Sequence, residues 1–189
     1  MPLIKICGIK DPATAQFSAE CGADYIGIVF APSSKRFVSL PLAKMIAEAA
    51  QKAGAIPVGV FVNMDAQEII AMADKTGIRY VQAYGLTEEL PQQYCRFYVN
   101  ERERVIQRPS DFILMETAEP GTGKTFNWDK FVPPMSAWFI AGGLKFSNVG
   151  EAISRFKPTG VDVSSGVETD GNKDREKIRA FIEKVKTYE

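Results

Sequence analysis

The chain of 189 residues contains no histidine. This absence excludes Ser-His and Cys-His catalytic arrangements and the usual histidine-ligated zinc sites of hydrolases. Any proton transfer must therefore be carried out by Cys, Asp, Glu, Lys or Tyr side chains. Cysteine is also scarce, with three residues at the widely spaced positions 7, 21 and 95. An odd number at such spacing is untypical of a disulfide framework or a clustered zinc site, so we expect reduced thiols.

The chain also lacks an excess of charge and a long apolar segment. Lys plus Arg and Asp plus Glu number 23 each, so no net field draws the chain to nucleic acid or to an anionic membrane. No run approaches the roughly 20 apolar residues of a membrane helix, and "MPLIKICGIKDP" at the N-terminus has no signal-peptide pattern. We therefore expect a cytoplasmic protein, folded as one domain over residues 1–189, whose partner is a small molecule and neither nucleic acid nor membrane.

The sequence does contain a repeating pattern of short apolar runs. The runs are "LIKIC" (3–7), "YIGIVF" (25–30), "IPVGVFV" (56–62), "YVQAY" (80–84), "FILME" (112–116), "AWFIAG" (137–142) and "GVDVS" (160–164). Such nearly continuous runs are typical of strands buried on both faces of a parallel sheet. Between most of them lie stretches of helical period. In the first stretch Asp11 can cap the helix, Pro12 fits its first position and Gly22 can end it.

Alternation of strand and helix predicts an α/β protein built from successive βα units. With "CRFYV" (95–99) as an eighth strand, the mean spacing is 189/8, or about 24 residues, against about 30 for an ordinary βα unit. We therefore predict a compact (βα)8 TIM barrel with a shortened segment, residues 86–111, around strands four to six. A doubly wound open sheet is the alternative, because one sequence does not give the strand order.

The segment 118–125, "AEPGTGKT", is similar to a phosphate-binding P-loop but has Ala in place of the first Gly. A P-loop must also be followed by a helix whose N-terminus faces the phosphates. Here "KTFNWDKFVPP" reaches two prolines shortly after Lys124, which excludes a long helix. We expect no nucleotide binding. The segment is instead predicted to form a loop over the site with Gly121 and Gly123 as its freest positions, or else a plain surface turn.

In a βα barrel the active site lies at the carboxyl ends of the strands. Cys7 ends the first run and Glu116 the sixth, which makes them a plausible base and acid, although Cys7 is also a common small buried residue. Strand alternation places Lys5 on the same face as Cys7. A lysine that faces a core needs a partner, and strands one and eight adjoin in a closed barrel. We therefore predict a Lys5–Asp162 pair, unless Lys5 points outward.

The last two strands end in small residues, in "IAGGL" (140–144) and "DVSSGVE" (162–168). Backbone N–H groups are open to an anion at such positions, and barrels frequently bind phosphate there. A phosphorylated substrate is therefore predicted. "SSKRF" (33–37) offers Lys35 and Arg36 on a loop near the same mouth, where Arg36 could grip a carboxylate with its guanidinium fork or could be a solvated loop charge.

Taken in order, six motifs carry a resemblance to a known family. They are "KICGI" (5–9), "GIVFAPSSKR" (27–36), "GVFVN" (59–63), "GTGKTFNW" (121–128), "AGGL" (141–144) and "GVDVSSGVE" (160–168). This combination resembles the phosphoribosylanthranilate isomerase family of tryptophan biosynthesis. The resemblance implies a βα barrel that converts N-(5-phosphoribosyl)anthranilate to 1-(2-carboxyphenylamino)-1-deoxyribulose 5-phosphate by an Amadori rearrangement, with no cofactor and no metal.

The resemblance also implies roles for individual residues. Cys7 is the general base that removes the proton from ribose C2, after Glu116 has protonated the ring oxygen as general acid. Arg36 binds the anthranilate carboxylate, and Asp162 lies near the sugar. The phosphate site consists of Gly142, Gly143, Ser164, Ser165 and Gly166. Glu116 must then have a raised pKa, and Cys7 needs help from Lys5, nearby amides or the first helix to lose its proton.

Two positions depart from the family pattern. The acid position normally holds Asp, and here it holds the longer Glu116. After the fourth strand the family commonly reads Val-Gln-Leu-His-Gly, whereas this chain reads "VQAYG", so that Tyr84 is expected to contact the ring end of the substrate. Neither departure removes an acid or a base, so we predict an active enzyme. The alternatives are a catalytically impaired phosphosugar-binding barrel and an isomerase that also accepts the related histidine-pathway substrate.

Overall fold

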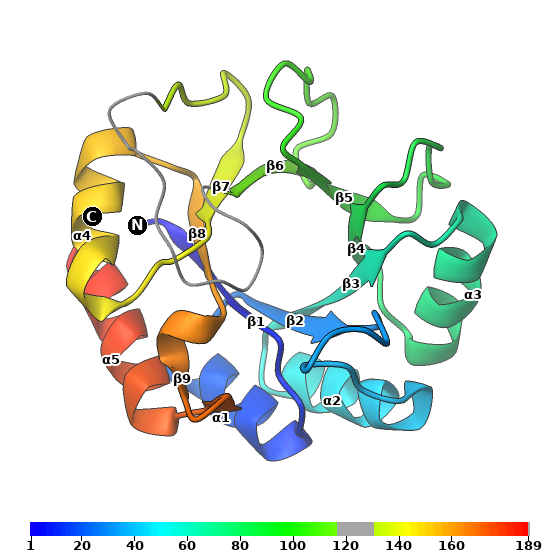
Figure 1. Cartoon of the computed structure of the whole chain (residues 1–189), viewed down its shortest axis with the longest axis horizontal. Helices are drawn as coiled ribbons and strands as arrows, with labels where there is room; N and C mark the ends of the chain where they lie inside the picture. Colours follow the sequence, from blue (N-terminus) through cyan, green and yellow to red (C-terminus); the bar gives the residue numbers. More distant parts are fainter. Residues whose placement is uncertain (117–130, 189) are drawn as a thin grey trace.

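The computed structural model describes residues 1–116 and 131–188. Eight parallel strands form a closed barrel in chain order, from β1 to β8, and are drawn as a ring of arrows in Figure 1. Strand β1 pairs with both β2 and β8, so the predicted barrel is confirmed and the open doubly wound sheet is wrong. The strands are β1 (Leu3–Cys7), β2 (Tyr25–Val29), β3 (Ile56–Val62), β4 (Tyr80–Tyr84), β5 (Cys95–Val99), β6 (Phe112–Glu116), β7 (Trp138–Ala141) and β8 (Gly160–Val163).

Five of these strands have the predicted bounds, and β2, β7 and β8 are shorter by one or two residues. The chain leaves β7 at Gly142, whose φ of 88° lies in the left-handed region that a strand cannot use. It leaves β8 at Ser164, where ψ turns to −82°. Both early ends fall at loops predicted to bind phosphate, so the backbone turns away from the barrel at those loops.

Helices cover the outside of the barrel, as Figure 1 shows. They are α1 (Pro12–Cys21), α2 (Leu40–Lys52), α3 (Ala66–Thr76), α4 (Phe146–Phe156) and α5 (Arg175–Lys186). Helix α1 begins and ends as predicted: the Asp11 carboxylate accepts the Thr14 N–H over 2.8 Å, and Gly22 closes the last turn with a φ of 109°. This cap fixes the entry to α1 four residues after the end of β1.

The predicted shortened segment contains no helix. Among described residues 85–111 and 131–137, only strand β5 and irregular loops are present. A buried arginine takes the place of a covering helix beside β5: Arg96 donates to the carbonyl oxygens of Glu88 over 3.0 Å and Leu86 over 3.5 Å. The Arg96 N–H in turn donates to Asp111 over 2.9 Å. The two bonds from the Arg96 side chain satisfy loop carbonyl oxygens that would otherwise be satisfied within a helix.

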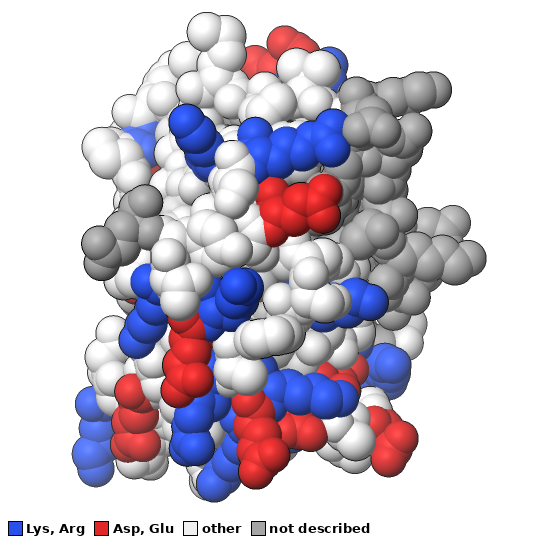
Figure 2. Space-filling model, turned by 90° about the vertical axis from the view of Figure 1, so that its left-hand side faces the viewer, with Lys and Arg blue, Asp and Glu red and all other residues white. Residues whose placement is uncertain are grey.

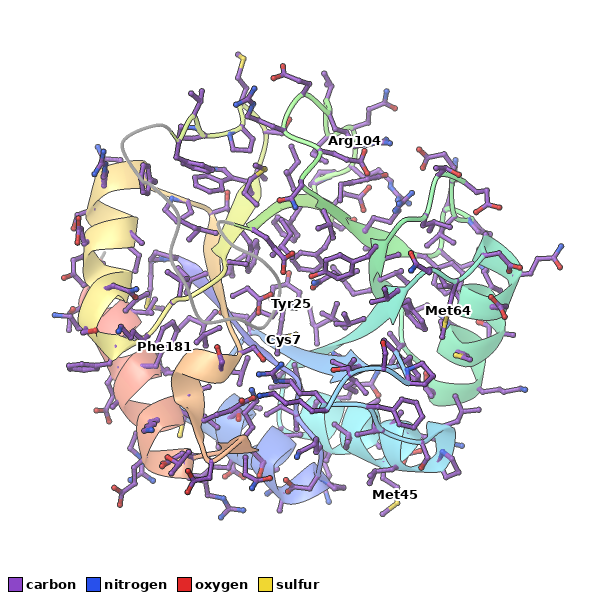
Figure 3. The ribbon with its side chains drawn as sticks, viewed as in Figure 1. Cys7, Tyr25, Met45, Met64, Arg104 and Phe181 are labelled. Atoms are coloured by element: carbon purple, nitrogen blue, oxygen red, sulfur yellow. The ribbon has the colours of Figure 1, made fainter. Side chains whose placement is uncertain are left out.

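The barrel interior is packed with aromatic rings. Tyr25 lies near the centre of the ring of strands in Figure 3, and its ring meets those of Phe97 at 5.5 Å and Phe139 at 5.8 Å, both edge to face. A separate small cluster of Cys7, Val29, Ala31 and Val60 with Tyr84 lies at the carboxyl ends of the strands. Because the interior is filled, a substrate has access to the barrel only at this mouth.

No helix within residues 1–116 and 131–188 is long and apolar enough to cross a membrane. On the face shown in Figure 2, basic and acidic side chains lie interspersed. This pattern agrees with the formal net charge of zero.

Candidate active site

A cavity of about 370 Å³ opens at the carboxyl ends of the strands. Nine of the ten predicted site residues line it, namely Cys7, Arg36, Tyr84, Glu116, Gly142, Gly143, Asp162, Ser164 and Ser165. A second hollow of about 780 Å³, beside residues 100–105 and Met115, is lined by none of them. The chemistry therefore belongs to the smaller cavity, where groups from distant parts of the chain converge. The predicted loop at 118–125 lies outside the described residues.

Cys7, at the end of β1, is held in a tight and largely buried position. The Ser164 hydroxyl donates to the Cys7 carbonyl oxygen over 3.0 Å. A methyl group at Gly27 on the neighbouring strand would lie 2.7 Å from Cys7 Sγ, so only glycine leaves room for the thiol. Burial raises the pKa of the Cys7 thiol, against the opposing effect of Lys5. Lys5 therefore gives the expected help toward losing the proton, but desolvation outweighs it.

The predicted Lys5–Asp162 pair is confirmed. Lys5 Nζ lies 2.7 Å from Asp162 Oδ2, and the lysine is fully buried. Burial alone would lower the pKa of Lys5, but Asp162 and Cys7 together outweigh it and the pKa is raised. Asp162 Oδ1 is buried and has no hydrogen-bond partner among the described residues. Asp162 lines the cavity, and an acceptor without a partner among the described residues suits a sugar hydroxyl.

Glu116, at the end of β6, is fixed at both its backbone and its side chain. Its N–H donates to Asn100 Oδ1 over 2.8 Å, and the Tyr84 hydroxyl donates to its Oε1 over 2.7 Å. Burial raises the pKa of the Glu116 carboxyl, against the lowering effect of the Tyr84 hydrogen bond. The predicted desolvation of this group is confirmed, and it favours the protonated form that a general acid needs.

Arg36 is buried rather than a solvated loop charge, with 8% of its surface exposed. Its Nε and Nη2 donate to the two oxygens of Glu168 over 2.7 and 2.9 Å. This ion pair uses the side edge of the guanidinium. No described residue accepts a hydrogen bond from Nη1, so the end edge remains for another carboxylate.

Sequence reasoning missed three partners of these groups: Gln82, Glu168 and Lys173. Lys173 Nζ donates to Glu168 Oε1 over 2.7 Å and to the Ser164 carbonyl oxygen over 2.9 Å. Burial would raise the pKa of Glu168, but hydrogen bonds from Arg36 and Lys173 lower it to about 2. The signal for Lys173 was the "TDGN" turn, which folds strands β9 (Glu168–Thr169) and β10 (Asn172–Lys173) into a hairpin.

The two predicted phosphate loops lie side by side at the ends of β7 and β8. Gly142 and Gly143 both have positive φ, 88° and 65°. Ser164 precedes the single-turn helix η2 (Ser165–Val167). Gly166 does not line the cavity, and its assignment to the phosphate site stays a prediction. A side chain there would overlap the carbonyl oxygen of Leu144, so Gly166 lets the two loops touch.

The variant Gly166→Ala is expected to raise the KM for the phosphorylated substrate at least about tenfold, because backbone atoms must move apart to admit the methyl group. The free energy of unfolding should fall by about 1–3 kcal/mol. Steady-state kinetics and denaturant unfolding measure the two effects. Gly171→Ala is the control, because that glycine has open space around it and should lose stability without a change in KM. An unchanged KM in Gly166→Ala would contradict the role of loop contact.

The family is shown by comparison with known proteins. The family profile described as N-(5'phosphoribosyl)anthranilate (PRA) isomerase matches residues 4–184. The chain belongs to this family. The N-(5'-phosphoribosyl)anthranilate isomerase of Chlamydia felis is 41% identical over 198 residues, which cover 97% of this chain and 96% of that protein. Isomerase 1 of Arabidopsis thaliana, described as chloroplastic, is 36% identical and covers 98% of this chain and 75% of its own length.

A solved structure of a phosphoribosyl anthranilate isomerase superposes with a TM-score of 0.78 at 31% identity, and the match covers 99% of this chain and all of that one. That enzyme is in complex with reduced 1-(o-carboxyphenylamino)-1-deoxyribulose 5-phosphate. The family match and these relatives show that the chain catalyses the isomerisation of phosphoribosylanthranilate in tryptophan biosynthesis. The substrate is a phosphorylated small molecule.

Proposed function

We propose that this chain carries out the isomerisation with Cys7 as general base and Glu116 as general acid. The observation that supports the assignment is the convergence of both groups on one cavity, from strands β1 and β6, which are not neighbours in the ring. Arg36 also lines this cavity and offers its guanidinium to a carboxylate. The loops after β7 and β8 line it as well and offer their backbone N–H groups to a phosphate. A substrate that carries both groups is thereby held with its ribose between the thiol and the carboxyl.

The first step opens the ribose ring. Glu116 donates its proton to the ring oxygen while the bond between C1 and that oxygen breaks, and the lone pair of the anthranilate nitrogen forms a double bond to C1. Burial raises the pKa of Glu116 and so keeps the acid protonated to higher pH. The product of this step is a cationic imine with an open chain.

The second step removes the proton from C2. The Cys7 thiolate takes this proton, and the electron pair of the C–H bond forms a double bond between C1 and C2 while the π electrons of the C1–N double bond return to nitrogen. Protonation of C1 and loss of the hydroxyl proton at C2 then give the ketone. The raised pKa of Cys7 makes the thiolate a minor form, whose fraction rises with pH in the range where the thiol titrates.

Substrate binding involves three polar contacts besides the phosphate loops. The end edge of Arg36 receives the anthranilate carboxylate, while Glu168 holds its side edge. Asp162 Oδ1, which has no partner among the described residues, accepts a ribose hydroxyl. Tyr84 lines the cavity beside Glu116 and contacts the ring end of the substrate.

The variant Arg36→Lys is expected to raise KM at least about tenfold with kcat within about threefold of the wild type. An ammonium group cannot bind Glu168 and a substrate carboxylate through two separate edges, as the guanidinium can. Steady-state kinetics with phosphoribosylanthranilate measure the change. Lys35→Met, the exposed neighbour on the same loop, is the control and should leave both constants unchanged. A wild-type KM in Arg36→Lys would show that another group binds the carboxylate.

The reaction is followed by the loss of phosphoribosylanthranilate fluorescence in the presence of the purified protein. Turnover by the wild type is the expected result. An inert wild type that still binds the reduced product analogue would favour a catalytically impaired phosphosugar-binding barrel. Parallel turnover of the histidine-pathway aminoaldose would identify a dual-substrate enzyme. We expect the chain to work in the cytoplasm as one domain, without nucleotide, and ATP should not change the rate.

A further inference from the structure

The two positions at which the sequence departs from the family pattern, Tyr84 and Glu116, contact each other. The Tyr84 hydroxyl donates to Glu116 Oε1 over 2.7 Å. Tyr84 ends β4 and Glu116 ends β6, so the contact bridges two strands that are separated by β5. Both side chains line the cavity. The longer acid and the tyrosine therefore form one unit at the mouth of the barrel.

A row of hydrogen bonds fixes the direction in which Tyr84 donates. Lys5 Nζ donates to Gln82 Oε1 over 2.8 Å, and Gln82 Nε2 donates to Tyr84 Oη over 2.9 Å. Lysine has no acceptor, so the Gln82 amide must present its oxygen to Lys5 and its NH₂ group to Tyr84. The Tyr84 oxygen thus accepts from Gln82, and its single proton goes to Glu116. Burial raises the pKa of Tyr84, with Glu116 adding to the effect, so the hydroxyl stays a donor.

This arrangement distinguishes the two oxygens of Glu116. Oε1 accepts the Tyr84 proton, whereas Oε2 is buried and has no hydrogen-bond partner among the described residues. A neutral carboxyl group has one O–H donor, and an oxygen that already accepts a hydrogen bond is the poorer place for that proton. The proton of the neutral acid therefore belongs on Oε2, where no group of the described residues competes for it.

We propose that Tyr84 is a positioning residue for the acid: by holding Glu116 Oε1 it reserves Oε2 for the proton that is transferred to the substrate. This inference rests on the proposed function, in which Glu116 is the acid. Tyr84 does not itself exchange a proton. The same row of hydrogen bonds continues through Gln82 and Lys5 to Asp162. The orientation of Glu116 is therefore coupled to the buried Lys5–Asp162 ion pair, which lies beside Cys7.

The variant Tyr84→Phe keeps the ring and removes the hydroxyl. We expect kcat to fall about tenfold, as for the loss of one hydrogen bond of ordinary strength, with a small change in KM. The low-pH limb of the rate profile should also move to higher pH, because the Tyr84 hydrogen bond lowers the pKa of Glu116, which loses its proton at lower pH than Cys7. The charged groups that act on Glu116, Lys5 on β1 and Asp162 on β8, are unchanged in this variant. Loss of packing alone would not move the limb.

Two further variants test whether Tyr84 acts through the acid. In the Glu116→Gln background, Tyr84→Phe should change the residual kcat by less than about twofold, because the acid proton is already absent. Glu116→Asp shortens the side chain by one methylene and breaks the contact with Tyr84. Its kcat should fall, and Tyr84→Phe should then cost little more. The Glu116→Asp measurement does not depend on the folding of the Tyr84→Phe single variant.

A matched tyrosine on the outside of the barrel serves as control. The buried Tyr94 hydroxyl donates to Asp74 Oδ1 over 2.6 Å and does not line the cavity. Tyr94→Phe loses a comparable hydrogen bond and some stability, and it should leave kcat and the low-pH limb unchanged. It therefore separates a loss of stability from a loss of positioning.

The outcomes separate the inference from the function on which it rests. A fall in kcat with a shifted limb, absent in the Glu116→Gln background, would support the positioning role. Wild-type kinetics in Tyr84→Phe, an unmoved limb, or an equal loss in the Glu116→Gln background would overturn it. Wild-type activity in Glu116→Gln itself would instead overturn the assignment of Glu116 as the acid.

Discussion

Replacement of Cys7 with alanine is expected to lower kcat by at least about a hundredfold, the lower end of what a positioned general base contributes. The thiol lines the cavity at the end of β1, and alanine fills most of its place without a group that accepts a proton. Steady-state decay of substrate fluorescence measures the loss. Binding of the reduced product analogue should persist, because Arg36 and the phosphate loops are unchanged.

A second cysteine provides the control for this prediction. Cys21 is the last residue of α1 on the outside of the barrel and does not line the cavity. Cys21→Ala should keep the wild-type kcat. If Cys7→Ala also turned over at the wild-type rate, the base would have to be another group, and the role of the thiol would be structural.

Replacement of Glu116 with glutamine is expected to lower kcat by at least about a hundredfold, because the amide has the same shape but cannot donate the acid proton. The variant should also change the pH dependence. In the wild type the rate falls at high pH once Cys7 is ionised, because further loss of protonated Glu116 is then no longer offset by an increase in thiolate. The residual rate of Glu116→Gln should lack this fall and should remain high once Cys7 is ionised.

The exposed Glu103, in the loop that follows β5, is the matched control for the acid. Glu103→Gln should keep both the rate and the shape of the profile. A Glu116→Gln variant that retained the wild-type high-pH limb would assign that limb to a different acid.

The barrel could be predicted from the sequence because each strand is a nearly continuous apolar run with a clear end. Cys7 and Glu116 were located by that rule alone, since the last residues of parallel strands meet at one end of a barrel. The Lys5–Asp162 pair followed from the closure that makes strands one and eight neighbours. These inferences depend on local pattern and topology, which one sequence carries.

The partners of the site residues could not be predicted in the same way. Glu168 and Lys173 reach Arg36 and Ser164 through a two-stranded hairpin whose direction over the mouth depends on tertiary packing. The raised pKa of Cys7 is a balance between desolvation and Lys5, and no sequence pattern gives its sign. Gly166 illustrates a related limit of prediction from sequence. The motif indicated that this residue is important, but only the structure shows that it allows two loops to touch and does not line the cavity.

The most direct test of the central claim is the single-turnover decay of phosphoribosylanthranilate fluorescence with excess wild-type protein, beside Cys7→Ala and Glu116→Gln. We expect rapid decay with the wild type and at least a roughly hundredfold slower decay with each variant, both of which still bind the reduced product analogue. An inert wild type, or a variant that decays as fast as the wild type, would contradict the assignment of Cys7 and Glu116 as the base and acid of an active isomerase.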